Sequence, residues 1–202
     1  MEFVNLDLIN EKKINELKEE FAKNEPYKHL FIKGFLDEGK ASEILRELKK
    51  EEFEHKESDL FSLNQTEDFK FTKNRILKEL YSSLKGKEFF KWLEEISGIK
   101  LEGEIDVSGS LYKNCDYLLC HDDQLESRKI AFVYYLSEGF DEKDGGEFVM
   151  FDSEKGKPWR VAKKYPPLWN SLLIFEVSEK SFHEVGENVG QKDRYAIGGW
   201  FH

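Results

Sequence analysis

Cysteine is scarce in this sequence: Cys115 and Cys120 are the two cysteines among 202 residues. Two cysteines cannot form the disulfide framework of a small secreted domain, so reduced thiols are expected, as in the cytosol or nucleus. No apolar run approaches the roughly 20 residues that span a membrane. Met1 to Leu8 lack the basic and apolar regions of a secretory signal. We therefore expect a protein without a membrane segment that resides in the cytoplasm, the nucleus or both.

Positive charge is also in short supply. The chain holds 31 Lys and Arg against 41 Asp and Glu, which gives a net charge of -10. A general nucleic-acid binder needs a basic face, so direct binding to nucleic acid is not expected. An acidic protein does suit a basic partner, although most charge of this kind lies on solvated surface.

The first half of the chain reads as helical. From Glu11 to about Ile99 it is rich in Lys, Glu and Leu, and apolar residues recur at helical spacing. Four helices are predicted, with Ser42 as N-cap of the second and Gly98 at the end of the fourth. A short strand is predicted over His29–Phe35. The apolar faces of the four helices are Ile14, Leu17 and Phe21; Ile44, Leu45 and Leu48; Ile76, Leu77, Leu80 and Tyr81; and Phe89, Phe90, Leu93 and Ile96.

From Asp106 onward, short β-rich segments alternate with turn residues. Seven strands at this spacing predict a β-sandwich or barrel, with the helical half covering one outer face. The sequence thus predicts one α+β domain over residues 1–202, in which 1–100 give mainly helical support and 101–202 form the β core. The predicted strands are Val107–Tyr112, Tyr117–Cys120, Ile130–Leu136, Glu147–Phe151, Ser171–Val177, Ser181–His183 and Tyr195–Phe201.

A candidate metal site combines residues from two of these strands. His121 and Asp123 stand one residue apart at a strand end, which places both side chains on the same face. His183 lies in a later strand. Two imidazoles and one carboxylate leave the opposite side of a metal open, which is the geometry of non-haem Fe(II) oxygenases. We expect these three residues to bind the metal and carry catalysis, and Asp122 to point away into the turn or a supporting hydrogen bond.

The same pattern has ordinary explanations. Chance alone yields a His-x-Asp in about one such chain in three, and a lone histidine such as His183 is more often structural than a ligand. His29 and His55 lie in the helical half without ligand partners, so both read as structural or surface residues. His202 reads as an exposed tail or as part of a longer chain.

Two further residues are candidates for binding the far carboxylate of 2-oxoglutarate beside such a metal. Arg194 opens the last predicted strand, and its planar guanidinium can grip a carboxylate at two points. The alternative is a surface arginine paired with Asp193. Tyr134 and Tyr135 face opposite sides of one strand, so Tyr135 would point inward, where its hydroxyl needs a partner. The alternative is a core tyrosine, and Trp200 is likewise read as core in preference to a cavity wall.

Several stretches of the second half are recognisable together. They are Leu119–Glu126, Arg128–Phe132, Trp169-Asn170, Phe175–Ser178, Ser181–His183 and Gly199–His202. These stretches resemble the ribosomal prolyl hydroxylases of the 2-oxoglutarate oxygenase superfamily. The resemblance is tight over Asp106 to His202 and looser in the helical half.

The resemblance implies a double-stranded β-helix of jelly-roll or cupin-like type, with flanking N-terminal helices. It implies Fe(II) as cofactor, held by His121, Asp123 and His183, with 2-oxoglutarate and O2 as cosubstrates. It further implies that Tyr135 and Arg194 bind the 2-oxoglutarate carboxylate. The implied reaction is hydroxylation of a prolyl residue in a partner protein, a small-subunit ribosomal protein near the decoding centre.

One departure from this family affects the substrate. Members of the family carry a second, related β-helix domain after the Gly-Trp-Phe-His segment, where this chain stops. A truncated chain and a compact single-domain form are both open. Three other functions also stay open: a cupin-like metal protein without oxygenase chemistry, a regulator that senses oxygen or 2-oxoglutarate, and an oxygenase acting on another residue or a small molecule.

Overall fold

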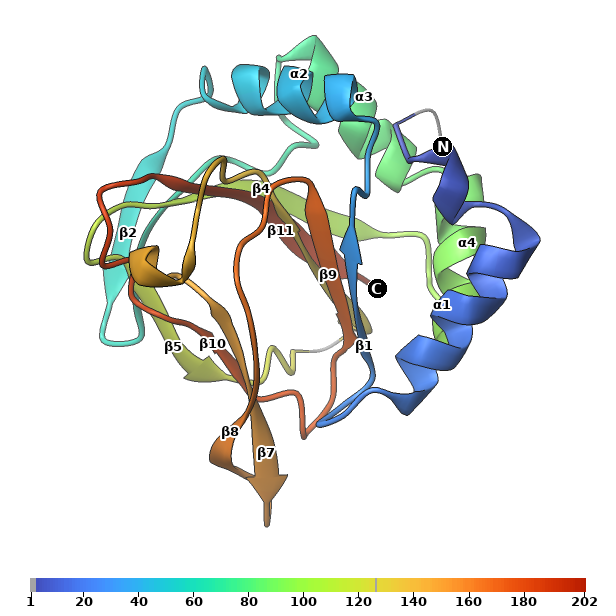
Figure 1. Ribbon diagram of the computed structural model, residues 1–202. Coiled ribbons are helices and arrows are strands. Elements are labelled where there is room, and N and C mark those ends of the chain that lie inside the picture. Colours follow the sequence, from blue (N-terminus) through green and yellow to red (C-terminus); the bar gives the residue numbers. More distant parts are fainter. Residues whose placement is uncertain (1–2, 126) are drawn as a thin grey trace.

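Antiparallel strands form one strongly curved, nearly closed sheet in the computed structural model (Figure 1), which describes residues 3–125 and 127–202. The strand order is β1-β9-β6-β11-β4-β3-β5-β10-β7-β8, and β2 pairs with β3. The strands are β1 (His29–Lys33), β2 (Glu54–Ser58), β3 (Phe61–Gln65), β4 (Ile105–Tyr112), β5 (Tyr117–His121), β6 (Ile130–Tyr135), β7 (Phe148–Glu154), β8 (Lys157–Tyr165), β9 (Ser171–Glu176), β10 (His183–Val185) and β11 (Arg194–Phe201).

Helices cover the outside of one part of this sheet. In Figure 1, α1 and α4 lie side by side on one flank, and α2 and α3 lie together at an adjoining edge. Among the described residues, no helix is long and apolar enough to cross a membrane. The helices are α1 (Glu11–Lys23), α2 (Glu38–Leu48), α3 (Arg75–Leu84) and α4 (Lys87–Ser97), and the short 3-10 helices are η1 (Leu6–Leu8) and η2 (Glu142–Asp144).

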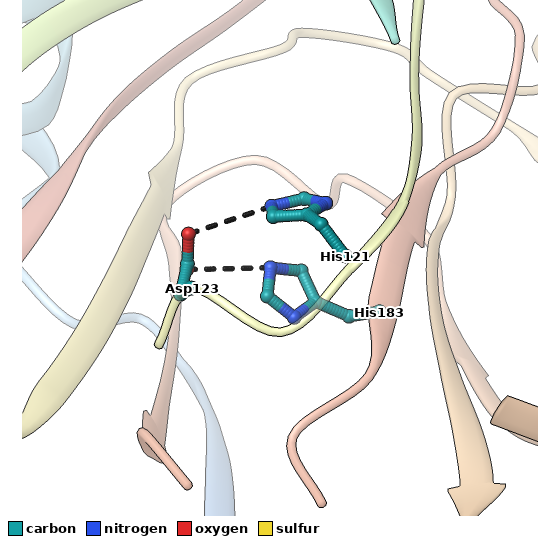
Figure 2. A group of neighbouring side chains, drawn as sticks. All are labelled: His121, Asp123 and His183. Atoms are coloured by element: carbon teal, nitrogen blue, oxygen red, sulfur yellow. Dashed lines mark ion pairs between the residues drawn. The ribbon is translucent and has the colours of Figure 1, made fainter. Parts of the chain in front are cut away.

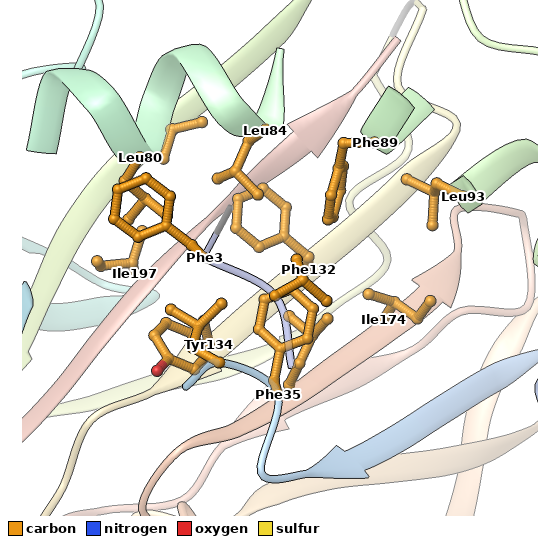
Figure 3. Packing of buried hydrophobic residues seen from close by; sticks show 14 of the residues in the cluster. Phe3, Phe35, Leu80, Leu84, Phe89, Leu93, Phe132, Tyr134, Ile174 and Ile197 are labelled. Carbon is orange, nitrogen blue, oxygen red and sulfur yellow. The ribbon is translucent and has the colours of Figure 1, made fainter. Parts of the chain in front are cut away.

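The two faces of the sheet build two separate cores, because successive strand residues point to opposite sides. In β6, Phe132 and Tyr134 join the large core beneath the helices, together with Phe89 of α4 (Figure 3). Their neighbours Ala131 and Tyr135 face the interior of the curved sheet and join the second core. The candidate site residue Tyr135 therefore lies on this inner side.

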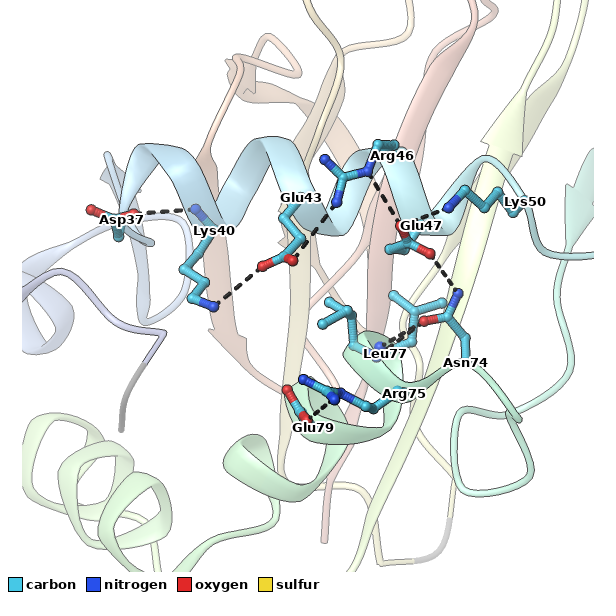
Figure 4. A network of polar contacts seen from close by, with 11 residues as sticks. Asp37, Lys40, Glu43, Arg46, Glu47, Lys50, Asn74, Arg75, Leu77 and Glu79 are labelled. Atoms are coloured by element: carbon cyan, nitrogen blue, oxygen red, sulfur yellow. Dashed lines mark hydrogen bonds and ion pairs between the residues drawn. The ribbon is translucent and has the colours of Figure 1, made fainter.

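A polar network joins α2 to α3 at the rim of the large core (Figure 4). Glu47 accepts hydrogen bonds from Lys50 Nζ at 2.7 Å and from Asn74 Nδ2 at 3.2 Å. Asn74 is the N-cap of α3, and its Oδ1 accepts from the backbone N–H groups of Ile76 and Leu77. One side chain thus caps a helix and ties it to its neighbour.

The structure confirms the predicted seven strands, with ends shifted by at most three residues, and the four predicted helices. The expected N-cap at Ser42 is wrong: α2 begins at Glu38, and the side chain of Asp37 accepts from Lys40 N. Three strands were not predicted from the sequence, namely β2, β3 and β8. The first half therefore contributes strands to the sheet as well as helical support.

Candidate metal centre

Strand pairing brings together two histidines that lie far apart in sequence. His121 ends β5, His183 begins β10, and the two residues are direct partners in the antiparallel ladder. Asp123 follows His121 in a turn, where its φ is 60°. A non-glycine residue rarely adopts this left-handed conformation. The turn returns the Asp123 carboxylate toward the two imidazoles.

The predicted three ligand groups converge (Figure 2). His121 Nε2 lies 3.4 Å from Asp123 Oδ1, and His183 Nε2 lies 3.4 Å from Asp123 Oδ2. The ligand atoms of all three residues lie within 4.8 Å of one another. Asp122 does not join them, since its Oδ1 accepts from Gln124 N in the turn, as the sequence predicted.

Backbone carbonyls orient both imidazoles. His121 Nδ1 lies 2.8 Å from Leu119 O, and His183 Nδ1 lies 2.7 Å from Ser181 O. A carbonyl only accepts, so each Nδ1 carries a proton and the Nε2 of each ring is turned toward Asp123. Two imidazole nitrogens and a carboxylate then meet, which is a set of ligands suited to a divalent cation once Nε2 carries no proton.

Charge and burial act in opposite directions on the pKa of the Asp123 carboxyl. Burial alone would raise the pKa of its carboxyl, but the imidazoles of His121 and His183 outweigh burial and hold that pKa well below its usual range. Burial also lowers the pKa of His121, whereas its contact with Asp123 raises it, and the net shift is upward. The carboxylate is consequently ionised at neutral pH and available as a ligand.

Aromatic rings hold His183 in place from two sides. Its ring stacks on Phe148 with 4.9 Å between centroids and meets the edge of Phe175 at 4.8 Å. The side chain of His183 is 4% exposed, whereas that of His121 is 26% exposed. The centre is therefore shielded from solvent on the side of His183 and accessible to solvent on the side of His121. On the inner side, the three residues line a cavity of about 150 Å³ together with Arg194 and Trp200.

Arg194 lies in this cavity wall as a buried cation. It is 1% exposed, and its Nε donates to Gly146 O at 2.8 Å. The alternative of a surface pair with Asp193 is wrong: within the described ranges, Arg194 has no carboxylate in salt-bridge contact, and its Nη2 has no hydrogen-bond partner. A buried guanidinium normally has an anionic partner, so this site fits a bound carboxylate.

Tyr135 presents a second buried donor without an acceptor. It is fully buried, and its hydroxyl has no partner among the described residues. Burial raises the pKa of Tyr135, an effect that Arg194 partly offsets, so the hydroxyl keeps its proton. Tyr134 on the opposite face donates to Asn170 Oδ1 at 2.9 Å instead. The alternation therefore places Tyr135 on the inner side, as predicted.

Sequence reasoning missed the surroundings of the centre. The guanidinium carbon of Arg128 lies 3.4 Å from the ring centroid of Trp200, and Arg128 Nη1 lies 3.8 Å from Asp123 Oδ1. Trp200 is half-buried and lines the cavity besides packing on the second core, which corrects its reading as core alone. No sequence signal joins Arg128 to Trp200, because they meet only when β11 pairs with β6, which places Trp200 opposite Ala131.

The other histidines stay outside the centre. His29 is buried and lies between Tyr27 O and the Tyr165 hydroxyl, so it is structural. His55 is exposed near Glu57. His202 is not an exposed tail, since its Nδ1 lies 2.8 Å from Ser127 Oγ and its Nε2 lies 3.0 Å from Asp106 Oδ2.

Comparisons with known proteins agree with this geometry. The family described as the 2OG-Fe(II) oxygenase superfamily matches residues 107–202. The chain is 39% identical over 183 residues to prolyl 3-hydroxylase OGFOD1 of Xenopus laevis, covering 88% of this chain and 35% of the relative. It is 33% identical over 189 residues to prolyl 3-hydroxylase sudestada1 of Drosophila melanogaster, covering 89% and 35%. The chain thus spans about a third of the length of these relatives.

Solved structures share the fold. A prolyl-4-hydroxylase of Pseudomonas putida superposes with a TM-score of 0.75 at 17% identity, covering 94% of this chain and 98% of the other. A prolyl hydroxylase of Trichoplax adhaerens, in complex with a hypoxia inducible factor peptide, gives 0.74 at 16% identity, covering 94% and 90%. The curved sheet is therefore the predicted double-stranded β-helix. The chain belongs to the 2OG-Fe(II) oxygenase superfamily, whose members take Fe(II) as cofactor and 2-oxoglutarate (2OG) as cosubstrate.

Proposed function

We propose that this chain is a 2OG-dependent dioxygenase that hydroxylates a prolyl residue in another protein. The observation that carries the proposal is the convergence of His121, Asp123 and His183, with atoms 3.4 Å apart, beside two buried donors without partners. The similar proteins of Xenopus laevis and Drosophila melanogaster are prolyl 3-hydroxylases by name, which supports the choice of proline as the target.

Each residue has a distinct part in this proposal. The Nε2 atoms of His121 and His183 and the carboxylate of Asp123 would hold Fe(II), with the imidazoles fixed through their Nδ1–H groups. Arg194 and Tyr135 would donate to the far carboxylate of 2OG, a charge-assisted arrangement suited to a buried site. Fe(II) and 2OG, when bound with O2, supply the oxidising chemistry, and the protein orients them and excludes water.

We further propose that the substrate is a small-subunit ribosomal protein near the decoding centre. Two features support this choice: the motif resemblance to ribosomal prolyl hydroxylases, and a net charge of -10 that suits a basic partner. The predicted single domain over residues 1–202 would carry the whole reaction, in the cytoplasm, the nucleus or both.

Two measurements test the proposal at its two levels. Succinate release from 2OG that increases with a peptide containing one central proline supports the hydroxylase, and 2OG binding without any turnover contradicts it in favour of a sensing role. Mass spectrometry of ribosomal proteins incubated with enzyme, Fe(II), 2OG and O2 then tests the substrate. No added oxygen on any proline would exclude the ribosomal substrate.

The matched variants are Asp123→Ala and Asp122→Ala. They remove neighbouring carboxylates of equal size, but only Asp123 contacts the two imidazoles. We expect turnover to be lost in the first variant and kept in the second. Equal loss in both would contradict the proposed ligand set.

A further inference from the structure

The hairpin formed by β7 and β8 projects beyond the body of the protein at the end where β5 delivers His121 (Figure 1). In the ladder between β7 and β10, Met150 pairs with His183. One further backbone hydrogen bond follows, in which Phe151 N donates to Phe182 O. β7 then continues to Glu154 with β8 as its partner, roughly 10 Å farther at 3.3 Å per residue. The hairpin tip therefore projects from the end of the sheet that carries His121 and His183.

The tip and the second strand of this hairpin are basic in an acidic protein, whereas β7 carries Asp152 and Glu154. The ten residues from Lys155 to Lys164 contain five cations and no acid, whereas the whole chain has a net charge of -10. Two of the cations face carboxylates: Arg160 Nε lies 2.7 Å from Asp152, and Lys164 Nζ lies 3.3 Å from Glu147. Within the described part of the chain, no carboxylate pairs with the other three, which are Lys155, Lys157 and Lys163.

The same hairpin exposes large apolar side chains. Trp159 is 66% exposed and Val161 is 50% exposed, both on β8. The lysines and Pro158 of β8 could be explained without a ligand. β8 is the last strand of the sheet, and charged or proline residues protect such edge strands from unwanted pairing. That explanation does not extend to Trp159 and Val161, which would favour association. An exposed tryptophan among unpaired lysines points to a ligand with both planar and anionic groups.

We propose that the β7–β8 hairpin binds single-stranded RNA. The unpaired lysines would contact phosphates, and Trp159 would stack on an unpaired base, the combination that sequence-tolerant single-strand binding uses. An acidic peptide without aromatic residues offers no ring to stack on Trp159, and a lipid surface would call for more apolar side chains than Trp159 and Val161. The expectation of no nucleic-acid contact came from the net charge of the whole chain, whereas the basic surface is local.

The surface itself does not depend on the proposed hydroxylase. The choice of RNA over DNA does rest on the proposed function, because a ribosomal substrate protein lies among RNA. RNA held at the hairpin would lie at the end of the sheet that carries His121 and His183. The two proposals fail separately, since RNA binding is measured without Fe(II), 2OG or a peptide.

Fluorescence anisotropy of a labelled oligouridylate of about 10 nucleotides, titrated with the full chain at several salt concentrations, tests the proposal. Trp159→Ala should raise Kd at least about fivefold through loss of stacking. The triple variant Lys155→Ala, Lys157→Ala, Lys163→Ala should raise Kd and reduce the slope of log K against log salt by about 2, at 0.7 per phosphate contact.

A matched control removes three lysines from the helical side. Lys12, Lys18 and Lys91 are exposed on α1 and α4, away from the hairpin. Their triple alanine variant should bind RNA like the parent, and all variants should keep the parent melting temperature. A control that loses as much affinity as the hairpin variant would overturn the proposal. So would tighter binding to oligothymidylate, to an oligoglutamate peptide or to phosphatidylserine vesicles than to the RNA.

Discussion

The guanidinium carbon of Arg194 lies 5.2 Å from the ring centroid of Tyr135. Both side chains are buried, and each ends in a donor without a partner among the described residues, Nη2 in one and the hydroxyl in the other. Unpaired buried donors cost free energy in the isolated protein. Their cost would be repaid on binding of a carboxylate that accepts from both, which links stability to ligand affinity at this pair.

Tyr135→Phe separates these two effects. The variant removes a buried hydroxyl that has no partner, so the free energy of unfolding without ligand should stay the same or rise. It should also weaken 2OG binding about tenfold, because a hydrogen bond to a carboxylate is lost. Calorimetric titration of 2OG into Mn(II)-loaded protein gives the affinity. An unchanged Kd would show that the hydroxyl does not meet the cosubstrate.

Tyr134→Phe is the matched control on the opposite face of β6. Its hydroxyl donates to Asn170 Oδ1, which also accepts from Leu36 N. Losing this bond should lower the free energy of unfolding by about 1 kcal/mol and leave 2OG affinity unchanged. Urea denaturation measures the first effect. A large change in 2OG affinity here would mean that the two faces of the strand are not independent.

Substitution of Asp123 should weaken metal binding, whereas substitution of its neighbour Asp122 should not. Asp123→Ala removes one of three ligands and should weaken Mn(II) binding by at least about a hundredfold, more than loss of a supporting hydrogen bond costs. Asp122→Ala removes only the acceptor for Gln124 N and should change the affinity little. Titration of Mn(II) followed by electron paramagnetic resonance checks both. Similar affinities for the two variants would contradict the ligand assignment.

The sequence predicted those strands whose side chains alone specify them. β6, β9 and β11 are buried on both faces or alternate clearly, and their pattern predicts a strand without reference to neighbours. β8 carries Pro158 and several lysines, and its strand conformation depends on pairing with β7. β2 is exposed at every position and depends in the same way on β3. Tertiary pairing, which local sequence does not encode, decides such strands.

The site was predicted to a similar degree. His121, Asp123 and His183 could be grouped because their types and order match a known coordination pattern, and Tyr135 because alternation sets its face. Arg128 could not be found, because its contacts with Asp123 and Trp200 depend on a left-handed turn and on the last strand. Contacts of that kind follow from the closed sheet and not from spacing along the chain.

His29 provides a further test that does not involve the metal. The ring is fully buried, with Nδ1 2.7 Å from Tyr27 O and Nε2 2.8 Å from the Tyr165 hydroxyl. Its Nδ1–H therefore donates and its Nε2 accepts, which is the pattern of a neutral imidazole. Burial lowers the pKa of His29 to about 4, the Tyr27 carbonyl acts in the opposite direction, and Lys163 lowers the pKa slightly further.

The pKa of His29 in the folded protein lies below the unfolded value of about 6.5. Between these two values, His29 binds a proton in the unfolded chain but not in the folded protein. Stability from this residue is therefore complete above about pH 6.5 and falls as pH decreases toward 4, by up to about 3 kcal/mol. Urea denaturation at about pH 7 and about pH 4.5 measures the change. His29→Gln keeps a donor and an acceptor but does not titrate, so it should lose much less stability between these pH values. An equal loss in the variant would assign the acid sensitivity to other groups.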